Sequence, residues 1–369
     1  MTKRTARNGK IDLLKFLFSL CVILNHAKYV VPSELEKYFL GFSLSVEFFF
    51  LVSGWLLMAS IEKAEKNSSL SLSKETGIFM LRKYKSLYPD VAVAYFFGII
   101  IVCVFTSAEF FPLFEKSWFD IFLIISTGLR GTGIISVTWY VSSMLICMAV
   151  LYPFIRKYKD MALNIVLPVG TLLILGFMYR NYSSVRGPLN WNGFTYYGNL
   201  RAMAELSMGC LCYCLSKKLK TVDFSSAGKT LLAIVEFAGY GMFVFYMASD
   251  FDGLKDFFYI FILCISVIIS FSGKSLGHKL FNNSTFTFLG KFSFPLYLVH
   301  GIIALQFSNI VPSAENMRTR DRLLIYLTIS FASAVAVMLI SKLIRKAGPI
   351  IISGIKKLTV KPTDTEEAV

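Results

Sequence analysis

Apolar residues occur along this chain in long runs that are separated by short polar segments. An α-helix needs about 20 apolar residues to cross a bilayer, and most of the runs approach that length. Strands of a membrane barrel would instead alternate polar and apolar residues, so the pattern excludes a barrel. We predict about ten transmembrane helices by this criterion, over residues 11–31, 39–61, 88–107, 137–155, 162–179, 199–215, 230–248, 257–271, 286–307 and 323–343.

A shorter apolar segment at residues 119–129 is too short to cross and is interpreted as interfacial or re-entrant. Lys and Arg concentrate before the first run, between the second and third, and in every second connection after that. Cytoplasmic loops carry such an excess, so both termini are predicted to be cytoplasmic. The segment before the last run, with Arg318, Arg320 and Arg322, departs from this pattern.

The composition supports this fold class. Hydrophobic residues make up 55% of the chain and charged residues 17%, whereas soluble domains contain about 25% charged residues. We therefore expect an all-α, polytopic membrane helical bundle over residues 1–346 and a short cytoplasmic tail over 347–369. The net charge of +15 reflects the loop asymmetry, so anionic lipids or an anionic cytoplasmic cofactor are better partners than nucleic acid. The seven cysteines fall within the predicted helices without histidines at zinc-ligand spacing, so we expect packing roles and no metal site.

Ionisable residues inside the predicted helices are the strongest candidates for function, because burying them in a membrane is costly. His26 and His300 are predicted to lie about 22 Å and about 20 Å from the cytoplasmic edge, which places them in the same layer. Lys15 precedes His26 on nearly the same helical face, about 16 Å away along the axis. Glu47 lies about 12 Å below the outer edge of the second helix and could meet His26.

A second group lies near the outer ends of the predicted helices. Arg201 and Glu205 are four residues apart and can pair on one helical face. Trp139 falls near the outer boundary, where aromatic rings often settle. Each residue also has a structural interpretation: the histidines as hydrogen-bonding partners, Glu47, Arg201 and Glu205 as ion pairs within the bundle, and Trp139 as an interfacial anchor.

Six segments, in this order and spacing, resemble the membrane acyltransferase-3 family of acyl-CoA-dependent carbohydrate O-acyltransferases. The segments are IDLLKFLFSLCVILNH, SLSVEFFFLVSGWLL, LRKYKSLYP, TWYVSSMLICMAVLYP, RAMAELSMG and FSFPLYLVHG, and the likeness covers nearly the whole chain. The resemblance implies transfer of an acyl group, usually acetyl, from cytoplasmic acyl-CoA to a hydroxyl of a cell-surface glycan or lipid-linked sugar. It also implies a bacterial plasma membrane and a role in modifying cell-envelope polysaccharide.

The chain departs from the family pattern in three places. The first-helix Arg and His of the family map onto Lys15 and His26, so the Arg is replaced by Lys. The family's Arg-x-x-Arg element reads Arg82-Lys83-Tyr84-Lys85, and lysine lacks the bidentate fork that suits a phosphate. Many relatives also carry an acidic residue after the Trp139 motif, where this chain has two serines.

We assign roles on this basis as hypotheses. His26 is the general base, Glu47 orients it or stabilises its charge, and His300 assists proton transfer or binds the acceptor. Lys15, Arg82, Lys83 and Lys85 hold the anionic CoA. Trp139, Arg201 and Glu205 border an outward-facing acceptor pocket. Two alternatives remain: a proton-coupled exporter of a glycan or small polar solute, with His and Glu as a relay, and a non-catalytic membrane partner or sensor.

Overall fold

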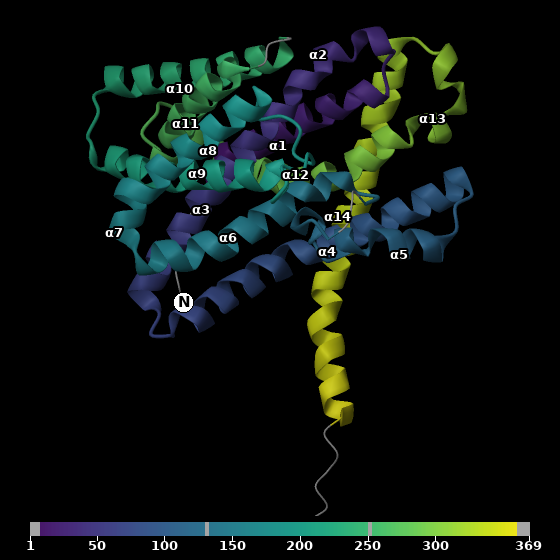
Figure 1. Ribbon diagram of the computed structural model, residues 1–369, viewed down its shortest axis with the longest axis horizontal. Coiled ribbons are helices and arrows are strands. Elements are labelled where there is room, and N and C mark those ends of the chain that lie inside the picture. Colours follow the sequence, from purple (N-terminus) through teal and green to yellow (C-terminus); the bar gives the residue numbers. More distant parts are fainter. Residues whose placement is uncertain (1–7, 130–132, 250–252, 360–369) are drawn as a thin grey trace, which may run out of the picture.

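The computed structural model describes residues 8–129, 133–249 and 253–359. Within these ranges the fold is a helical bundle, and the only β contact is an isolated bridge between Trp191 and Tyr196 (Figure 1). The longer helices are α1 (Gly9–His26), α3 (Val46–Asn67), α4 (Leu72–Thr106), α5 (Phe110–Ile121), α6 (Trp139–Lys157), α8 (Leu167–Tyr182), α9 (Tyr197–Thr221), α10 (Ser226–Ala248), α11 (Leu254–Ser272), α12 (Ser284–Leu305) and α14 (Thr319–Thr359). Three short helices, α2 (Lys37–Leu40), α7 (Lys159–Met161) and α13 (Phe307–Ile310), lie in the connections.

Eight helical segments of the described chain are long and apolar enough to cross a membrane. They correspond to α3, α4, α6, α8, α10, α11, α12 and α14, in three cases together with a short helical turn before them. The all-α membrane class is therefore confirmed. The two other helices expected to cross, α1 and α9, carry several charged residues each, and a count of ten crossings stays a prediction.

Two helices have ends that differ from the predicted ones. α1 ends at His26, and the next three residues, Ala27–Tyr29, form a 3₁₀ turn. α4 begins at Leu72, sixteen residues before the expected start at residue 88. Arg82, Lys83 and Lys85 therefore lie on a continuous helix rather than in a loop.

α3 and α9 cross with their backbones in contact. A Cβ added at Gly54 would collide with the carbonyl oxygen of Leu206, and one added at Gly209 would collide with the backbone of Leu51 and Gly54. Such small residues let membrane helices approach closely. Cys210 Sγ also donates to the Gly54 carbonyl at 3.4 Å. The crossing fixes which residues on the outer parts of the two helices face one another.

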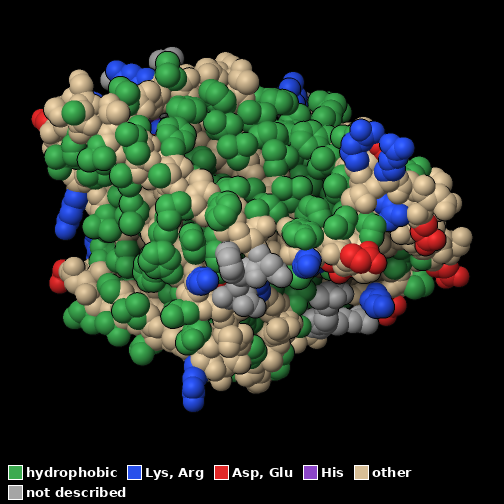
Figure 2. Space-filling model, turned by 90° about the horizontal axis from the view of Figure 1, so that it is seen from above, with side chains coloured by type: hydrophobic (Ala, Val, Ile, Leu, Met, Phe, Trp, Pro, Cys, Tyr) green, Lys and Arg blue, Asp and Glu red, His purple; other side chains and the backbone are tan. Residues whose placement is uncertain are grey.

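α1 packs against α12, and α14 packs against both α12 and α4. The N-terminal end of α1 is tied to α10 by a buried ion pair, in which Lys10 Nζ lies 2.8 Å from Glu236 Oε2. Large apolar side chains are left exposed on the outside of the bundle, among them Leu231 and Phe245 of α10 and Phe258 of α11. Figure 2 looks onto the top of Figure 1 and shows apolar side chains over most of that face, as lipid contact requires.

α14 does not end at the predicted domain boundary. The helix continues past residue 346 to Thr359, and its C-terminal part leaves the bundle at the bottom of Figure 1. The first thirteen residues assigned to a tail over 347–369 are thus helical, and residues 360–369 lie outside the described residues.

Candidate active site

His26 and His300 lie in contact at the centre of the candidate site. Nδ1 of His26, the last residue of α1, is 3.2 Å from Nε2 of His300, which lies in the C-terminal half of α12. The ring centroids are 4.7 Å apart and the rings nearly perpendicular. His300 is completely buried, whereas His26 is partly exposed. The packing of α1 on α12 therefore brings together two histidines that are 274 positions apart.

The hydrogen bonds define which nitrogen of each ring carries the proton. His300 Nδ1 lies 3.2 Å from the Leu296 carbonyl and His26 Nδ1 lies 3.1 Å from the Val22 carbonyl. A carbonyl oxygen only accepts, so both Nδ1 atoms carry hydrogen in the neutral rings. The one N–H of His26 is then shared between the Val22 carbonyl and Nε2 of His300, and Nε2 of His26 is left with its lone pair. That nitrogen has the form a general base requires.

Two tyrosines hold the helices that carry this pair. The Tyr326 hydroxyl of α14 lies 3.3 Å from the Ile23 carbonyl of α1 and 3.5 Å from the His300 carbonyl of α12. The Tyr297 hydroxyl donates to the Val137 carbonyl at 2.5 Å. Both phenols are buried. Each tyrosine hydroxyl therefore donates to backbone carbonyl groups that lie close to a candidate site residue.

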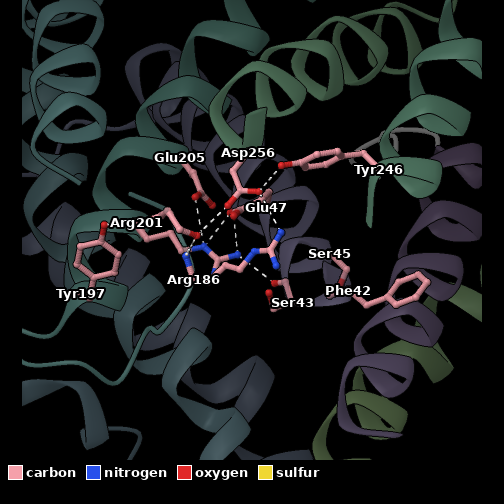
Figure 3. A network of polar contacts seen from close by, with 11 residues as sticks. Phe42, Ser43, Ser45, Glu47, Arg186, Tyr197, Arg201, Glu205, Tyr246 and Asp256 are labelled. Atoms are coloured by element: carbon pink, nitrogen blue, oxygen red, sulfur yellow. Dashed lines mark hydrogen bonds and ion pairs between the residues drawn. The ribbon is translucent and has the colours of Figure 1, made fainter. Parts of the chain in front are cut away.

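Glu47 does not contact His26 as the sequence suggested. Arg201 of α9 lies between Glu47 of α3 and Glu205, one turn further along α9 (Figure 3). Arg201 Nε donates to Glu47 Oε2 at 3.0 Å, and its Nη2 is 2.5 Å from Glu47 Oε1 and 3.1 Å from the Ser43 carbonyl. The expected pairing of Arg201 with Glu205 is confirmed, at 3.4 Å. Glu47 reaches Arg201 because the close crossing of α3 and α9 directs both toward the same interior layer.

Trp139 joins this second cluster. Its ring lies 5.7 Å from the guanidinium carbon of Arg201, within cation–π distance. Arg201, Glu47 and Glu205 are almost completely buried, and Trp139 is 9% exposed. The three residues expected to bind an acceptor thus lie together, but they face the protein interior in this conformation.

Two of the four predicted CoA-binding residues, Arg82 and Lys83, line a cavity at the end of the bundle where α3 ends and α4 begins. Its volume is 590 Å³, and its lining includes Lys63, Ser68, Arg82 and Lys83. Lys15 of α1 lies close enough to Lys83 for the two charges to repel each other. Lys85 is exposed and does not line this cavity. The arrangement offers cations to an anionic ligand at the predicted cytoplasmic side.

A carboxylate also lines the cavity, but its charge is balanced. Glu75 Oε1 accepts from the Tyr152 hydroxyl at 2.9 Å and from Arg156 Nε at 3.0 Å. Lys63, Arg82 and Lys83 consequently dominate the electrostatic potential of the cavity, with no acidic lining residue left to oppose them among the described residues.

A comparison with protein families matches residues 8–344 to the acyltransferase 3 family, whose description is "Acyltransferase domain". The match spans nearly the whole chain and includes both clusters and the cavity. The chain belongs to the acyltransferase-3 family. With its apolar helices, it is a multi-pass membrane acyltransferase. No curated protein and no solved structure matches the chain.

Some residues of the acyltransferase site could not be singled out from the sequence. Lys63 and Ser68 line the cavity opposite Arg82, but in the sequence they are ordinary polar residues after an apolar run. Tyr326 is one hydroxyl in a long apolar helix, and its position between two backbone carbonyls depends on how α14 packs. The one sequence feature that could indicate a role for Tyr326 is its polar hydroxyl group within an apolar segment.

Proposed function

We propose that this membrane acyltransferase moves an acyl group, by default acetyl, from cytoplasmic acyl-CoA to a hydroxyl of a cell-surface or lipid-linked carbohydrate. The observation that carries the proposal is the contact between His26 and His300, which leaves Nε2 of His26 as a base. The proposal places the protein in a bacterial plasma membrane, where the glycan lies outside and acyl-CoA inside.

In the proposed step, His26 Nε2 takes the proton of the acceptor hydroxyl as its oxygen attacks the thioester carbon. A new C–O bond forms and the C–S bond breaks. The proton on His26 then passes to the departing CoA sulfur, which leaves as a thiol. His300 stabilises the imidazolium by accepting a hydrogen bond from His26 Nδ1. General base catalysis of this kind contributes about 10²- to 10⁴-fold to a rate.

The acyl donor would bind with its phosphates in the cavity near Lys63, Arg82 and Lys83, and Lys15 would add a fourth charge along the path to His26. Lys15 and His26 are about 16 Å apart along α1. The pantetheine arm would therefore extend beside α1 toward the histidine pair. Lys85 lies outside the cavity lining, so its contribution would be to attract the donor over a distance.

The acceptor would bind on the opposite side, where Trp139 would stack on a sugar ring and Arg201 and Glu205 would bind its hydroxyls. These side chains are buried in the described conformation. The acceptor would therefore enter only after the outer ends of the helices separate. This motion would also keep bulk water away from the thioester until a sugar is present.

The decisive experiment measures thiol release from radiolabelled acetyl-CoA by the purified protein in nanodiscs, with a cell-envelope extract as acceptor. We expect the wild type to transfer label to an extract component and His26→Ala to lose at least about 100-fold of this activity, since it removes the base. His278→Ala is the matched control, because His278 lies in the 3₁₀ turn His278–Phe281, outside the site. Its turnover should equal that of the wild type.

Turnover retained by a folded His26→Ala protein would exclude His26 as the base. A folded wild type that neither binds nor consumes acyl-CoA, but moves a glycan across the membrane, would favour the exporter instead. His26→Asn, which keeps a polar side chain at the end of α1, serves if the alanine variant does not fold.

A further inference from the structure

The Glu47, Arg201 and Glu205 cluster has an excess of negative charge. Two carboxyl groups share one guanidinium, and the side chains of all three are at most 1% exposed. Each buried charge requires a partner, because leaving one uncompensated costs several kcal/mol. Arg201 can neutralise one carboxylate, so the second has no opposite charge within the cluster.

The neighbouring charges do not remove this excess. Arg186 and Asp256 lie beside the cluster in Figure 3 and form their own ion pair at 3.2 Å. Asp256 also accepts from the hydroxyls of Ser184 at 2.8 Å and Tyr246 at 2.7 Å. Within the part of the chain that the structure describes, both networks together contain two guanidinium groups and three carboxyl groups, so one negative charge remains in excess.

Four further titratable groups of the described residues interact electrostatically with Arg201 or Glu205, and all four are neutral near pH 7 by their ordinary chemistry. They are three phenols and a thiol: Tyr140 on α6, Tyr197 on α9, Tyr297 on α12 and Cys264 on α11. A neutral phenol or thiol does not compensate a carboxylate charge. The balance therefore has to be restored within the cluster.

The carboxylate oxygens of the cluster also lack hydrogen-bond donors. Among the described residues, neither oxygen of Glu205 receives a hydrogen bond, and Glu47 Oε1 receives none of good geometry. Both carboxyl groups contact the one guanidinium group of Arg201, at 2.5 Å and 3.4 Å, and this places them next to each other for a hydrogen bond. Two carboxylates cannot form this bond, because both are acceptors, whereas a carboxyl and a carboxylate form a strong one.

We propose that Glu47 and Glu205 share one proton, so that they and Arg201 form a closed, electrically neutral proton-binding site inside the bundle. The proton removes the excess charge and supplies the missing donor at the same time. The inference does not depend on the proposed function, since it follows from charge, burial and hydrogen bonding alone. The position of the site next to Trp139 means that the proton lies on the predicted outer side of the molecule.

Infrared spectroscopy of the purified protein tests this proposal, because a protonated carboxyl group has a C=O stretching band that shifts in D₂O. Asp120 of α5 is a second buried acid, and burial raises its pKa to about 7. Spectra are therefore recorded at alkaline pH, where Asp120 is ionised. We expect one carboxyl band in the wild type and its loss in both Glu47→Gln and Glu205→Gln, because either change leaves one carboxylate for Arg201.

Glu236→Gln is the control variant. Glu236 is as deeply buried but is balanced by Lys10 at 2.8 Å, so this variant should keep the band. A band that survives in either single variant would overturn sharing by the pair. Wild-type protein containing glutamate with a ¹³C-labelled side-chain carboxyl group gives a test without any substitution: the band should move with the label, and an unmoved band or no band would overturn the proposal.

Discussion

His26 and His300 are fixed by the same local contact. Each ring directs Nδ1 to the carbonyl four residues earlier in its own helix, that of Val22 or Leu296. The contact needs no partner from elsewhere in the fold, so it sets the tautomer as soon as each helix forms. The packing of α1 on α12 then decides only whether the two rings meet.

This arrangement predicts different effects for the two histidines. His300→Ala should lower kcat of acetyl transfer by at least about tenfold, because a hydrogen bond to a charged group such as the imidazolium contributes about 1.5–3 kcal/mol. The KM for acyl-CoA should change little, and the base His26 stays in place. Thiol release at varied acyl-CoA concentration measures both constants. A loss in His300→Ala as deep as in His26→Ala would contradict the assignment and make His300 the base.

At this scale the sequence predicted the histidine pair but not its neighbours. Equal depths could be counted from the ends of the apolar runs, and the two rings are indeed in contact. The partner of Glu47 could not be predicted in this way, because depth gives height in the membrane and not the direction in which a side chain points. Glu47 and Arg201 are 154 positions apart and meet only through the crossing of α3 and α9.

α3 and α9 are the pair of elements that positions the carboxylate cluster. Their contact at Gly54 and Gly209 leaves no room for a side-chain carbon. Glu47 lies seven residues before Gly54, and Glu205 four residues before Gly209. Gly54 meets the backbone of Leu206 and Gly209 meets that of Leu51, so Glu205 directly adjoins the contact and Glu47 lies one turn before it.

Gly54→Ala should therefore destabilise the protein by about 1–3 kcal/mol, the usual cost of inserting a carbon into a well-packed interior. The backbone carbonyl of Leu206 cannot move aside as a flexible side chain would. Thermal unfolding in one detergent measures the effect. Gly241→Ala is the control, because a Cβ at this position on α10 meets nothing within 4 Å, and it should leave stability equal or slightly raised. Equal midpoints for both variants would contradict the tight crossing.

The existence of most helices could be predicted from the apolar runs, but their ends could not. Hydropathy reports which residues suit lipid and not which backbone groups continue a helix. Residues 27–31 are mostly apolar, yet α1 ends at His26. The first sixteen residues of α4 are rich in polar side chains, yet they are helical and carry Arg82 and Lys83.

The whole molecule has the cationic cavity at one end and the Glu47, Arg201 and Glu205 cluster toward the other. Clusters of Lys and Arg on the cytoplasmic side of a bundle bind anionic head groups and phosphates. The cavity of 590 Å³ between α3 and α4 has this character. Lys15, which precedes His26 on α1, lies near Lys83 of the cavity lining.

Lys63→Gln and Arg82→Gln should each weaken CoA binding about tenfold, because a hydrogen bond to a charged group contributes about 1.5–3 kcal/mol. The difference in CoA affinity between wild type and variants should become smaller as the salt concentration is raised, since screening already weakens the charge contact in the wild type. Calorimetric titration of CoA at low and high ionic strength measures both effects. Lys279→Gln removes an exposed charge outside the cavity and should not change affinity. Unchanged affinity in the two cavity variants would exclude this binding site.

The backbone contact between α3 and α9 also has a mechanical consequence. Two helices that touch through glycine cannot slide past each other without breaking the contact, so they move as one rigid unit. An opening that admits a bulky molecule from outside would therefore require the other helices to move away from the α3–α9 pair. α1, α12 and α14 are held to one another by hydroxyl-to-carbonyl hydrogen bonds and by ring packing. We expect these three helices to move together when the site opens.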